Sequence, residues 1–192
     1  PEARRRRLLR FYKECVRRQL ALDGGDRVHL SKNPTYCGRV ESLIEAFPDA
    51  RIVVTMRHPY ETIPSLLKLM QRGWQIRNWS DEDMQSSLRV LAGMSIHNYE
   101  HPLAVLARHP ETPHAIVDYR DLVAEPRRTI EAVYARLGFP VSSGYAEVLE
   151  EEQKRARRHE IESGLPCQRE RLLGLDLGHE QVPLVRVEVR QD

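Results

Sequence analysis

Residues 51–65 run Arg51-Ile-Val-Val-Thr-Met-Arg57-His-Pro59-Tyr-Glu-Thr-Ile-Pro-Ser65. The β-branched, apolar start of this stretch predicts a buried strand of a parallel sheet. Proline is favoured at the first position of a helix, so a helix should begin at Pro59. Arg57 then lies beyond the carboxyl end of the strand, where α/β sheets bind ligands, and the free N–H groups of the helix start attract anions. The stretch therefore predicts an α/β fold with an anion site at Arg57 and Ser65.

Strands and helices alternate on both sides of this stretch. Further short apolar segments at 28–32 and 114–119 predict strands, and the tail at 182–190 alternates like an edge strand and holds a proline, which edges tolerate. Amphipathic patterns predict helices at about 4–22, 37–47, 80–107, 128–137 and 145–161, with loops at 73–80 and 122–126. Such alternation is typical of an α/β domain with a parallel sheet flanked by helices.

The composition is that of an ordinary soluble domain. The chain has 192 residues, 41% hydrophobic and 30% charged, with a net charge of +2. We expect one domain over residues 1–192, and the near-neutral charge gives no indication of a nucleic-acid partner. The three cysteines show neither a metal-ligand spacing nor a disulfide framework, so a reducing, cytoplasmic compartment is expected. No apolar run approaches the ~18 residues that a membrane span needs.

Four segments follow one another at a specific spacing: Lys32-Asn-Pro-Thr-Tyr, Phe47-Pro-Asp-Ala-Arg51, Arg57-His-Pro-x5-Ser65 and Asp118-Tyr119-Arg-Asp-Leu. Together they resemble the sulfotransferases that use 3′-phosphoadenylyl sulfate (PAPS), most closely the broad and largely bacterial group. The resemblance covers about 28–140 and implies the P-loop NTPase-like sulfotransferase fold. Relatives begin with a strand and a loop that binds the 5′-phosphosulfate, and nothing before Lys32 forms such a cradle. Since the chain also begins at Pro1 inside a helical pattern, we expect an N-terminally truncated domain without that first strand and loop.

The resemblance implies that Arg57 and Ser65 bind the 3′-phosphate of PAPS. A guanidinium presents several donors to a phosphate, and the serine adds a hydroxyl. The alternative is a strand-end arginine that pairs with a surface carboxylate, next to an exposed serine. Tyr119 would lie beside the nucleotide, and a core or strand-capping tyrosine is its alternative. Arg120 stands where relatives carry an acidic residue, which argues against a role for that position.

Lys32 is the expected catalytic residue. Sulfuryl transfer, like phosphoryl transfer, depends mainly on positioning and on stabilising charge at the transferring group. The matching lysine of the family has that role, whereas the alternative is an ordinary solvated lysine. The general base is not identified: relatives carry a histidine shortly after the lysine, and here Thr35 and Tyr36 follow it. The base would lie in a missing segment, or be His97 or His101.

Two further features each allow two interpretations. The run Arg4-Arg5-Arg6-Arg7 is either a solvated helix face or a targeting or nucleic-acid patch. Trp74 and Trp79 either line an acceptor pocket or pack in the core.

The sequence thus predicts a sulfotransferase that moves a sulfuryl group from the co-substrate PAPS to a hydroxyl or amine. The acceptor would be a small molecule, a glycan or a lipid, and the pattern requires no metal. The alternative is a non-catalytic, sulfotransferase-like remnant that acts as an interaction module, since the 5′-phosphosulfate loop and the histidine are absent. A P-loop kinase would need a Gly-Lys-Ser/Thr loop, which the sequence lacks.

Overall fold

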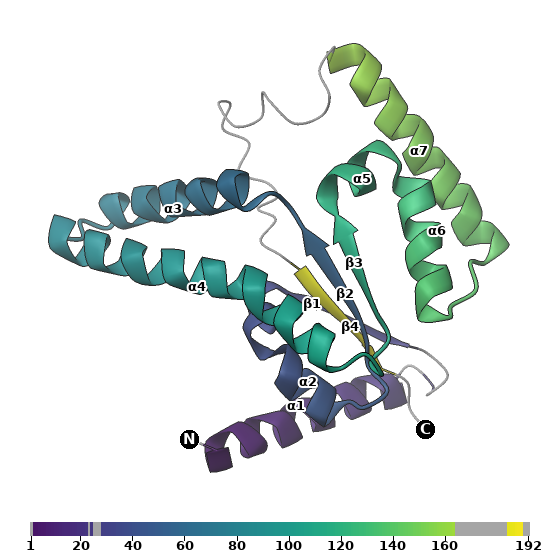
Figure 1. Cartoon of the computed structure of the whole chain (residues 1–192), viewed down its shortest axis with the longest axis horizontal. Coiled ribbons are helices and arrows are strands. Elements are labelled where there is room, and N and C mark those ends of the chain that lie inside the picture. The colour runs from purple at the N-terminus through teal and green to yellow at the C-terminus, as the bar shows by residue number, and fades with distance from the viewer. Residues whose placement is uncertain (1, 23, 25–27, 164–183, 190–192) are drawn as a thin grey trace.

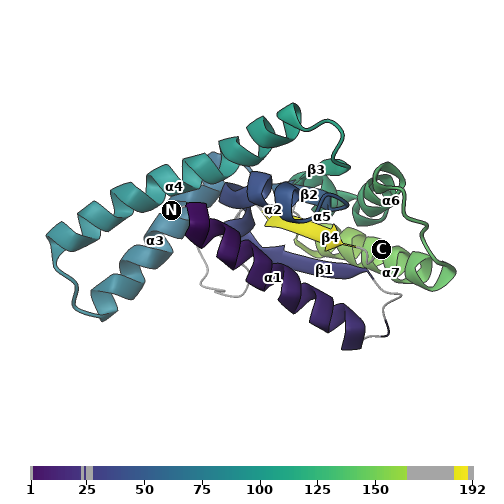
Figure 2. The same ribbon diagram turned by 90° about the horizontal axis from the view of Figure 1, so that it is seen from below.

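The computed structural model describes residues 2–22, 24, 28–163 and 184–189. Within these residues a four-stranded sheet forms the centre, and helices cover parts of both its faces (Figure 1 and Figure 2). The strands are β1 (His29–Asn33), β2 (Arg51–Met56), β3 (His114–Asp118) and β4 (Leu184–Val189). Their order across the sheet is β1-β4-β2-β3.

The sheet is mixed. β2 and β3 run parallel, with Ile52 beside His114 and Met56 beside Asp118, as expected. β4 is antiparallel to both of its neighbours, β1 and β2. The prediction of an edge strand in the tail is therefore wrong, because β4 is paired on both sides. Alternation of side chains reports the two faces of a strand and not its two edges, so it could not place β4.

The helices confirm the expected ranges to within a few residues. They are α1 (Glu2–Leu22), α2 (Val40–Ala46), α3 (Pro59–Ile76), α4 (Asp81–Arg108), α5 (Tyr119–Ala124), α6 (Pro126–Leu137) and α7 (Ser143–Ser163), with a 3₁₀ helix, η1 (Pro34–Arg39). As expected, Pro59 opens α3. The Ser80 hydroxyl caps α4 by accepting the backbone N–H of Asp83 at 3.1 Å. Gly138 ends α6 in the left-handed conformation, with φ 71°.

Two expected loops are helical instead. Trp74 lies in the last turns of α3, and most of the segment 122–126 belongs to α5 and α6. The expected loop at 73–80 begins with Gly73, but a glycine inside a helix costs only about 1 kcal/mol. The packing of α3 against α4 outweighs that cost.

The core lies on both faces of β2. Ile52 and Val54 are fully buried on one face, against residues of α1, α2 and α4. Val53 points to the other face and packs with Val117 of β3 and Leu137 of α6. Burying such a side chain is worth about 1.5–3 kcal/mol, so the strand that precedes Arg57 is firmly held.

The two cysteines of the described residues differ in exposure. Cys37 of η1 is completely buried in the core between α2 and α4, and Cys15 of α1 is exposed. Neither forms a disulfide.

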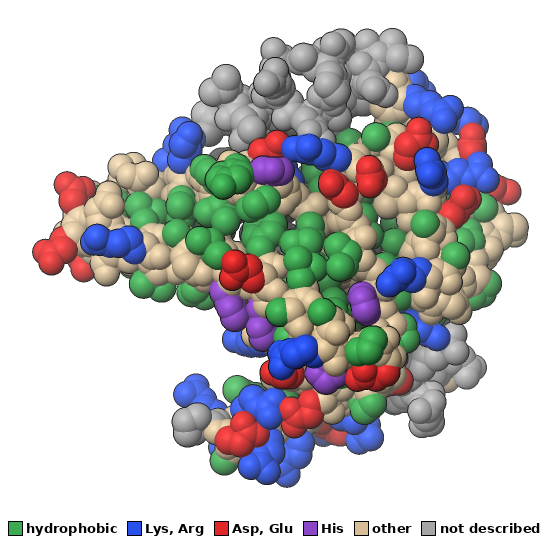
Figure 3. All heavy atoms as spheres, in the orientation of Figure 1, with side chains coloured by type: hydrophobic (Ala, Val, Ile, Leu, Met, Phe, Trp, Pro, Cys, Tyr) green, Lys and Arg blue, Asp and Glu red, His purple; other side chains and the backbone are tan. Residues whose placement is uncertain are grey.

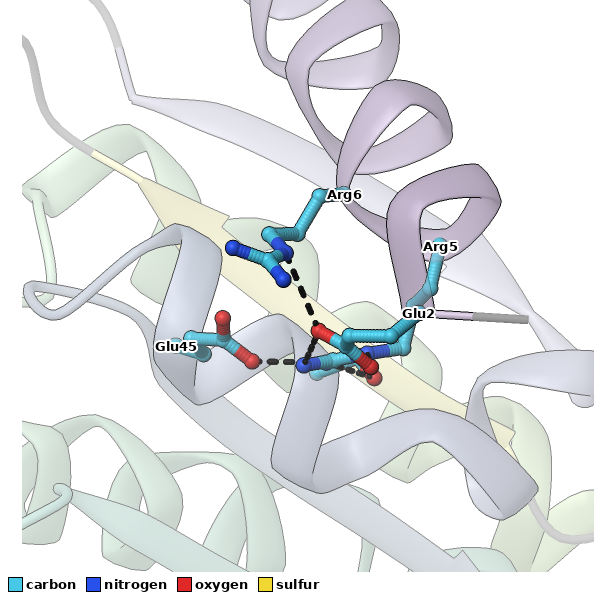
Figure 4. A network of polar contacts seen from close by, with 5 residues as sticks. Glu2, Arg5, Arg6 and Glu45 are labelled. Atoms are coloured by element: carbon cyan, nitrogen blue, oxygen red, sulfur yellow. Dashed lines mark hydrogen bonds and ion pairs between the residues drawn. The ribbon is translucent and has the colours of Figure 1, made fainter.

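An exposed charge network fastens α1 to α2 (Figure 4). The Arg5 guanidinium lies 2.9 Å from Glu2 and 2.6 Å from Glu45, and Arg6 lies 3.3 Å from Glu2. Arg5 also donates to the Ser42 hydroxyl at 3.0 Å. Two residues of the basic run at 4–7 are therefore engaged within the molecule.

Hydroxyl groups connect α1 to β1 and η1. The Tyr12 hydroxyl lies 2.7 Å from that of Tyr36 and 3.1 Å from that of Ser31. The Nε2 atom of His29 lies 2.5 Å from the Ser31 hydroxyl. Burial, and then the hydrogen bond with Tyr12, raise the pKa of Tyr36 to about 12. Tyr36 is thus a poor base at neutral pH, as expected from its type.

Candidate functional site

Arg57 and His58 connect β2 to α3. The backbone N–H groups of Glu61 and Thr62 both bond to the carbonyl of His58, at 3.0 and 3.1 Å, which starts the helix tightly after the strand. We call the surroundings of this connection the β2–α3 corner. It comprises residues 57–65 together with Tyr99, Tyr119 and Arg120.

The Glu61 carboxylate is shared by two arginines at this corner. One of its oxygens lies 3.3 Å from Nε of Arg57, and the other lies 3.2 Å from Nη2 of Arg120. The side chains of Arg57 and Glu61 are 25% and 28% exposed. The structure therefore contains the carboxylate pairing that was the alternative interpretation of Arg57, and the partner belongs to the same corner.

Tyr119 lies against Arg57. The guanidinium carbon stands 5.4 Å from the centre of the tyrosine ring, within the range of a cation–π contact. The Asp118 carboxylate caps α5 by accepting the backbone N–H of Arg120 at 2.7 Å. The sharp start of α5 after β3 thus brings both Tyr119 and Arg120 to the corner.

Ser65 lies one turn beyond Glu61 on α3. Residues four apart on a helix share a face, so Ser65 follows Glu61 on the same side of α3. Its side chain is exposed, and no hydrogen bond of it is found in the part of the chain that the structure describes. Arg57 thus lies just before α3 and Ser65 within its first two turns, and the structure links them only through the position of Glu61.

Tyr99 is a component of the corner that sequence reasoning missed. It is 8% exposed, and among the described residues its hydroxyl has no hydrogen-bond partner of good geometry, although Thr62 lies near it. Burial raises the pKa of Tyr99, and the neighbouring Thr62 hydroxyl and Arg57 guanidinium oppose that effect. A buried, unpaired hydroxyl costs about 1–3 kcal/mol. The sequence showed only that this position belongs to a helix.

Lys32 lies on β1, some distance from Arg57. Lys32 and Val53 both pair with the same residue of β4, so they are level in the sheet and share a face. Strands lie about 4.8 Å apart and each residue advances about 3.3 Å, so the α-carbons of Lys32 and Arg57 are roughly 16 Å apart. Lys32 is exposed, and a ligand that touches both residues must extend along the carboxyl ends of the strands.

The two histidines considered as a base form a pair on α4. The rings of His97 and His101 lie 4.7 Å apart, and a side chain at Gly38 of η1 would meet His97 at 3.7 Å. Burial, and then the charge of His97, lower the pKa of His101, which favours its neutral form. The pair lies beside η1, the segment that directly follows β1 and Lys32.

The tryptophans lie at the far end of the α3–α4 hairpin. The rings of Trp74 and Trp79 stack 5.1 Å apart at an angle of 10°. They pack on each other where the chain turns from α3 to α4, which is the tip of the hairpin in Figure 1. On the face shown in Figure 3, apolar side chains gather over this hairpin, and charged ones lie mainly around its rim.

A family model described as the sulfotransferase family matches residues 2–143. The chain belongs to the sulfotransferase family. The match confirms the resemblance seen in the four segments, and it begins in α1, earlier than the 28–140 region we had recognised. No curated protein and no solved structure matches the chain.

Membership of the sulfotransferase family supports a transferase that moves a sulfuryl group. Within the described ranges, this sulfotransferase shows no group of three or more His, Cys, Asp or Glu residues placed to hold a metal ion. Its described helices include none that is long and apolar enough to cross a membrane.

Proposed function

We propose that this sulfotransferase moves a sulfuryl group from PAPS to a hydroxyl or amine acceptor and leaves adenosine 3′,5′-bisphosphate. The observation that carries the proposal is the placement of Arg57. Its guanidinium stands at the carboxyl end of β2, a quarter exposed, against the ring of Tyr119. Ser65 follows two turns along α3 with an exposed hydroxyl.

The residues at the corner fit the 3′-phosphate end of PAPS. A guanidinium and a hydroxyl are donors suited to a phosphate monoester. The Tyr119 ring beside Arg57 offers an apolar surface next to those donors, as a nucleoside needs. PAPS, when bound, supplies the activated sulfuryl group.

Lys32 has the catalytic role in this proposal. Its exposed ammonium group, at the carboxyl end of β1, would offset negative charge at the transferring group. The expected consequence is a loss of sulfuryl transfer in Lys32→Ala of about a hundredfold or more, with unchanged affinity for adenosine 3′,5′-bisphosphate. Release of the bisphosphate from PAPS in the presence of acceptor measures this. Equal rates in the two proteins would remove Lys32 from the mechanism.

The binding half is tested by calorimetry with adenosine 3′,5′-bisphosphate. A charge-assisted contact contributes about 1.5–3 kcal/mol, so Arg57→Ala should weaken binding by roughly ten- to a hundredfold. Arg18→Ala is a matched control, because Arg18 pairs with Glu14 four residues away on α1 as Arg57 does with Glu61. Adenosine 5′-monophosphate, which lacks the 3′-phosphate, should bind both proteins equally.

Equal affinity of wild type and Arg57→Ala for the bisphosphate would defeat the assignment of the site. Absence of both binding and transfer in the wild-type chain would favour the interaction module over the enzyme.

A further inference from the structure

The β2–α3 corner has more positive than negative charge among its paired groups. Arg57 and Arg120 come from segments 63 residues apart, and both reach the single carboxylate of Glu61. The nearby carboxylate of Asp118 caps α5, and within the described residues it forms no ion pair with either guanidinium. The two arginines therefore share one carboxylate, which leaves a net positive charge between them.

The corner also holds a polar group that lacks a partner. The Tyr99 hydroxyl is buried beside Thr62, Arg57 and Glu61 and has no hydrogen bond of good geometry within the described parts of the chain. Folded proteins rarely leave a buried hydroxyl unpaired. This observation is independent of the charges, and it places a second unusual polar group at the same corner.

We propose that Arg120 and Arg57 together bind a phosphate monoester dianion, and that the Glu61 carboxylate takes its place while the site is free. This inference deepens the proposed function and rests on it: the dianion is the 3′-phosphate that Arg57 and Ser65 receive. Two guanidinium groups match the two charges and the several acceptor oxygens of a phosphate better than they match one carboxylate.

Glu61 has two opposed effects in this scheme. In the free protein it holds both guanidiniums near each other and keeps them oriented, so less ordering is needed when the ligand arrives. Its negative charge also competes with the ligand for both arginines. Glu61 is thus a positioning residue that limits the affinity of the site.

The test uses the 192-residue chain and calorimetry with two probes, adenosine 3′,5′-bisphosphate and inorganic phosphate. Arg120→Ala should weaken binding of the bisphosphate about tenfold or more. The affinity of Arg120→Lys should lie between those of wild type and Arg120→Ala, because lysine keeps the positive charge but lacks the paired N–H donors of a guanidinium. Glu61→Gln should strengthen binding of both probes roughly three- to tenfold, since like charge at the site is removed.

Arg127→Ala serves as the matched control. Arg127 is also an arginine held by glutamates, Glu131 and Glu150, but it lies between α6 and α7. Its removal should leave both affinities unchanged. Thermal unfolding of every variant checks the fold, and Arg120→Lys carries the test if Arg120→Ala does not fold, because the side chain is 48% exposed.

The outcomes separate this inference from the proposed function. If Arg57→Ala weakens binding while Arg120→Ala and Glu61→Gln match wild type, the two-arginine site is wrong and the proposed function stands. If both arginine variants bind as tightly as wild type, or if the wild-type chain binds neither probe at about 10 mM, the two-arginine site and the proposed function are both wrong. Weaker binding in Glu61→Gln would overturn the exchange of the carboxylate for the phosphate.

Discussion

The charge network of α1 and the β2–α3 corner use the same residue types, but they differ in the number of carboxylates available to each arginine. Along α1, two arginines face two glutamates, and the hydroxyls of Tyr12, Tyr36 and Ser31 bond to one another. At the corner, two arginines share Glu61, and the Tyr99 hydroxyl has no well-placed partner in the described structure.

This difference shows which arginines are informative in an arginine-rich chain. The sequence shows a run of four arginines at 4–7, and neither the length nor the charge of that run marks a site. Where the fold supplies a carboxylate for each guanidinium, the group is neutralised and serves the structure. Where it supplies too few, a ligand can complete the pairing. The predictions that follow test this contrast, beginning with the largest expected effect.

Replacing the two paired arginines should affect the affinity for adenosine 3′,5′-bisphosphate at the corner but not on α1. Arg57→Ala with Arg120→Ala removes two charge-assisted contacts, so the affinity for adenosine 3′,5′-bisphosphate should fall by at least about a hundredfold. Arg5→Ala with Arg6→Ala makes the same change in net charge on α1 and should leave the affinity unchanged. Calorimetry at one ionic strength compares the pairs. Similar losses in both would mean that overall charge, and not the corner, attracts the ligand.

Removal of a tyrosine hydroxyl should change the free energy of unfolding in opposite directions in the two regions. Tyr12→Phe removes a paired hydroxyl and should lower the free energy of unfolding by about 1 kcal/mol. Tyr99→Phe removes a buried, unpaired hydroxyl and should raise it by a similar amount, about 1 kcal/mol. Urea unfolding of both variants measures the difference. A loss of stability in Tyr99→Phe would show that this hydroxyl already has a partner.

High pH should lower the stability of the fold through ionisation of Tyr36, which lies against α1. Folding raises the pKa of Tyr36 to about 12 from its usual value near 10. The unfolded chain therefore loses this proton first, and the contribution of Tyr36 to stability is complete below pH 10 and disappears as the pH rises toward 12. Unfolding midpoints between pH 9 and 12 would show the decline, and Tyr36→Phe should make it shallower. An identical slope in the variant would assign the decline to other groups.

The smallest effect should come from the charge network on α1 itself. Its members are exposed, and exposed ion pairs contribute little because water and salt screen them. Arg5→Ala should lower the melting temperature slightly, and by less than Tyr12→Phe. The hydrogen bond from Arg5 lowers the pKa of Glu2, so this contribution is present at neutral pH and is lost as the pH falls through the folded pKa of Glu2. A large loss would show that the network supports the packing of α1.

The connection from β2 to α3 could be predicted from the sequence because its signals are local. A β-branched run, a proline at the helix start and an arginine between them define the strand, the turn and the charge within a few residues. The same holds for α4, where Ser80 and the acids after it mark the start. The four spaced segments were also sufficient to recognise the family that the comparison then showed.

The rest of the corner could not be predicted, because it depends on packing between distant segments. Arg120 reaches Glu61 only since β3 pairs with β2 and α5 begins at once after β3. In the sequence, an arginine at position 120 argued against a role for that position, yet in the fold Arg120 is the second guanidinium that contacts Glu61. The place of β4 likewise depends on pairing partners, about which a single strand pattern carries no information.

The complete burial of Cys37 gives the molecule an internal reporter. A thiol reagent can reach Cys37 only when η1 separates from the helices around it, whereas Cys15 on the surface is open to reaction throughout. The rate of labelling at Cys37 therefore measures how often this part of the interior opens. Tyr99 of the β2–α3 corner lies on α4, the helix against which η1 packs. A ligand that tightens the corner should be visible as protection of a thiol that it never touches.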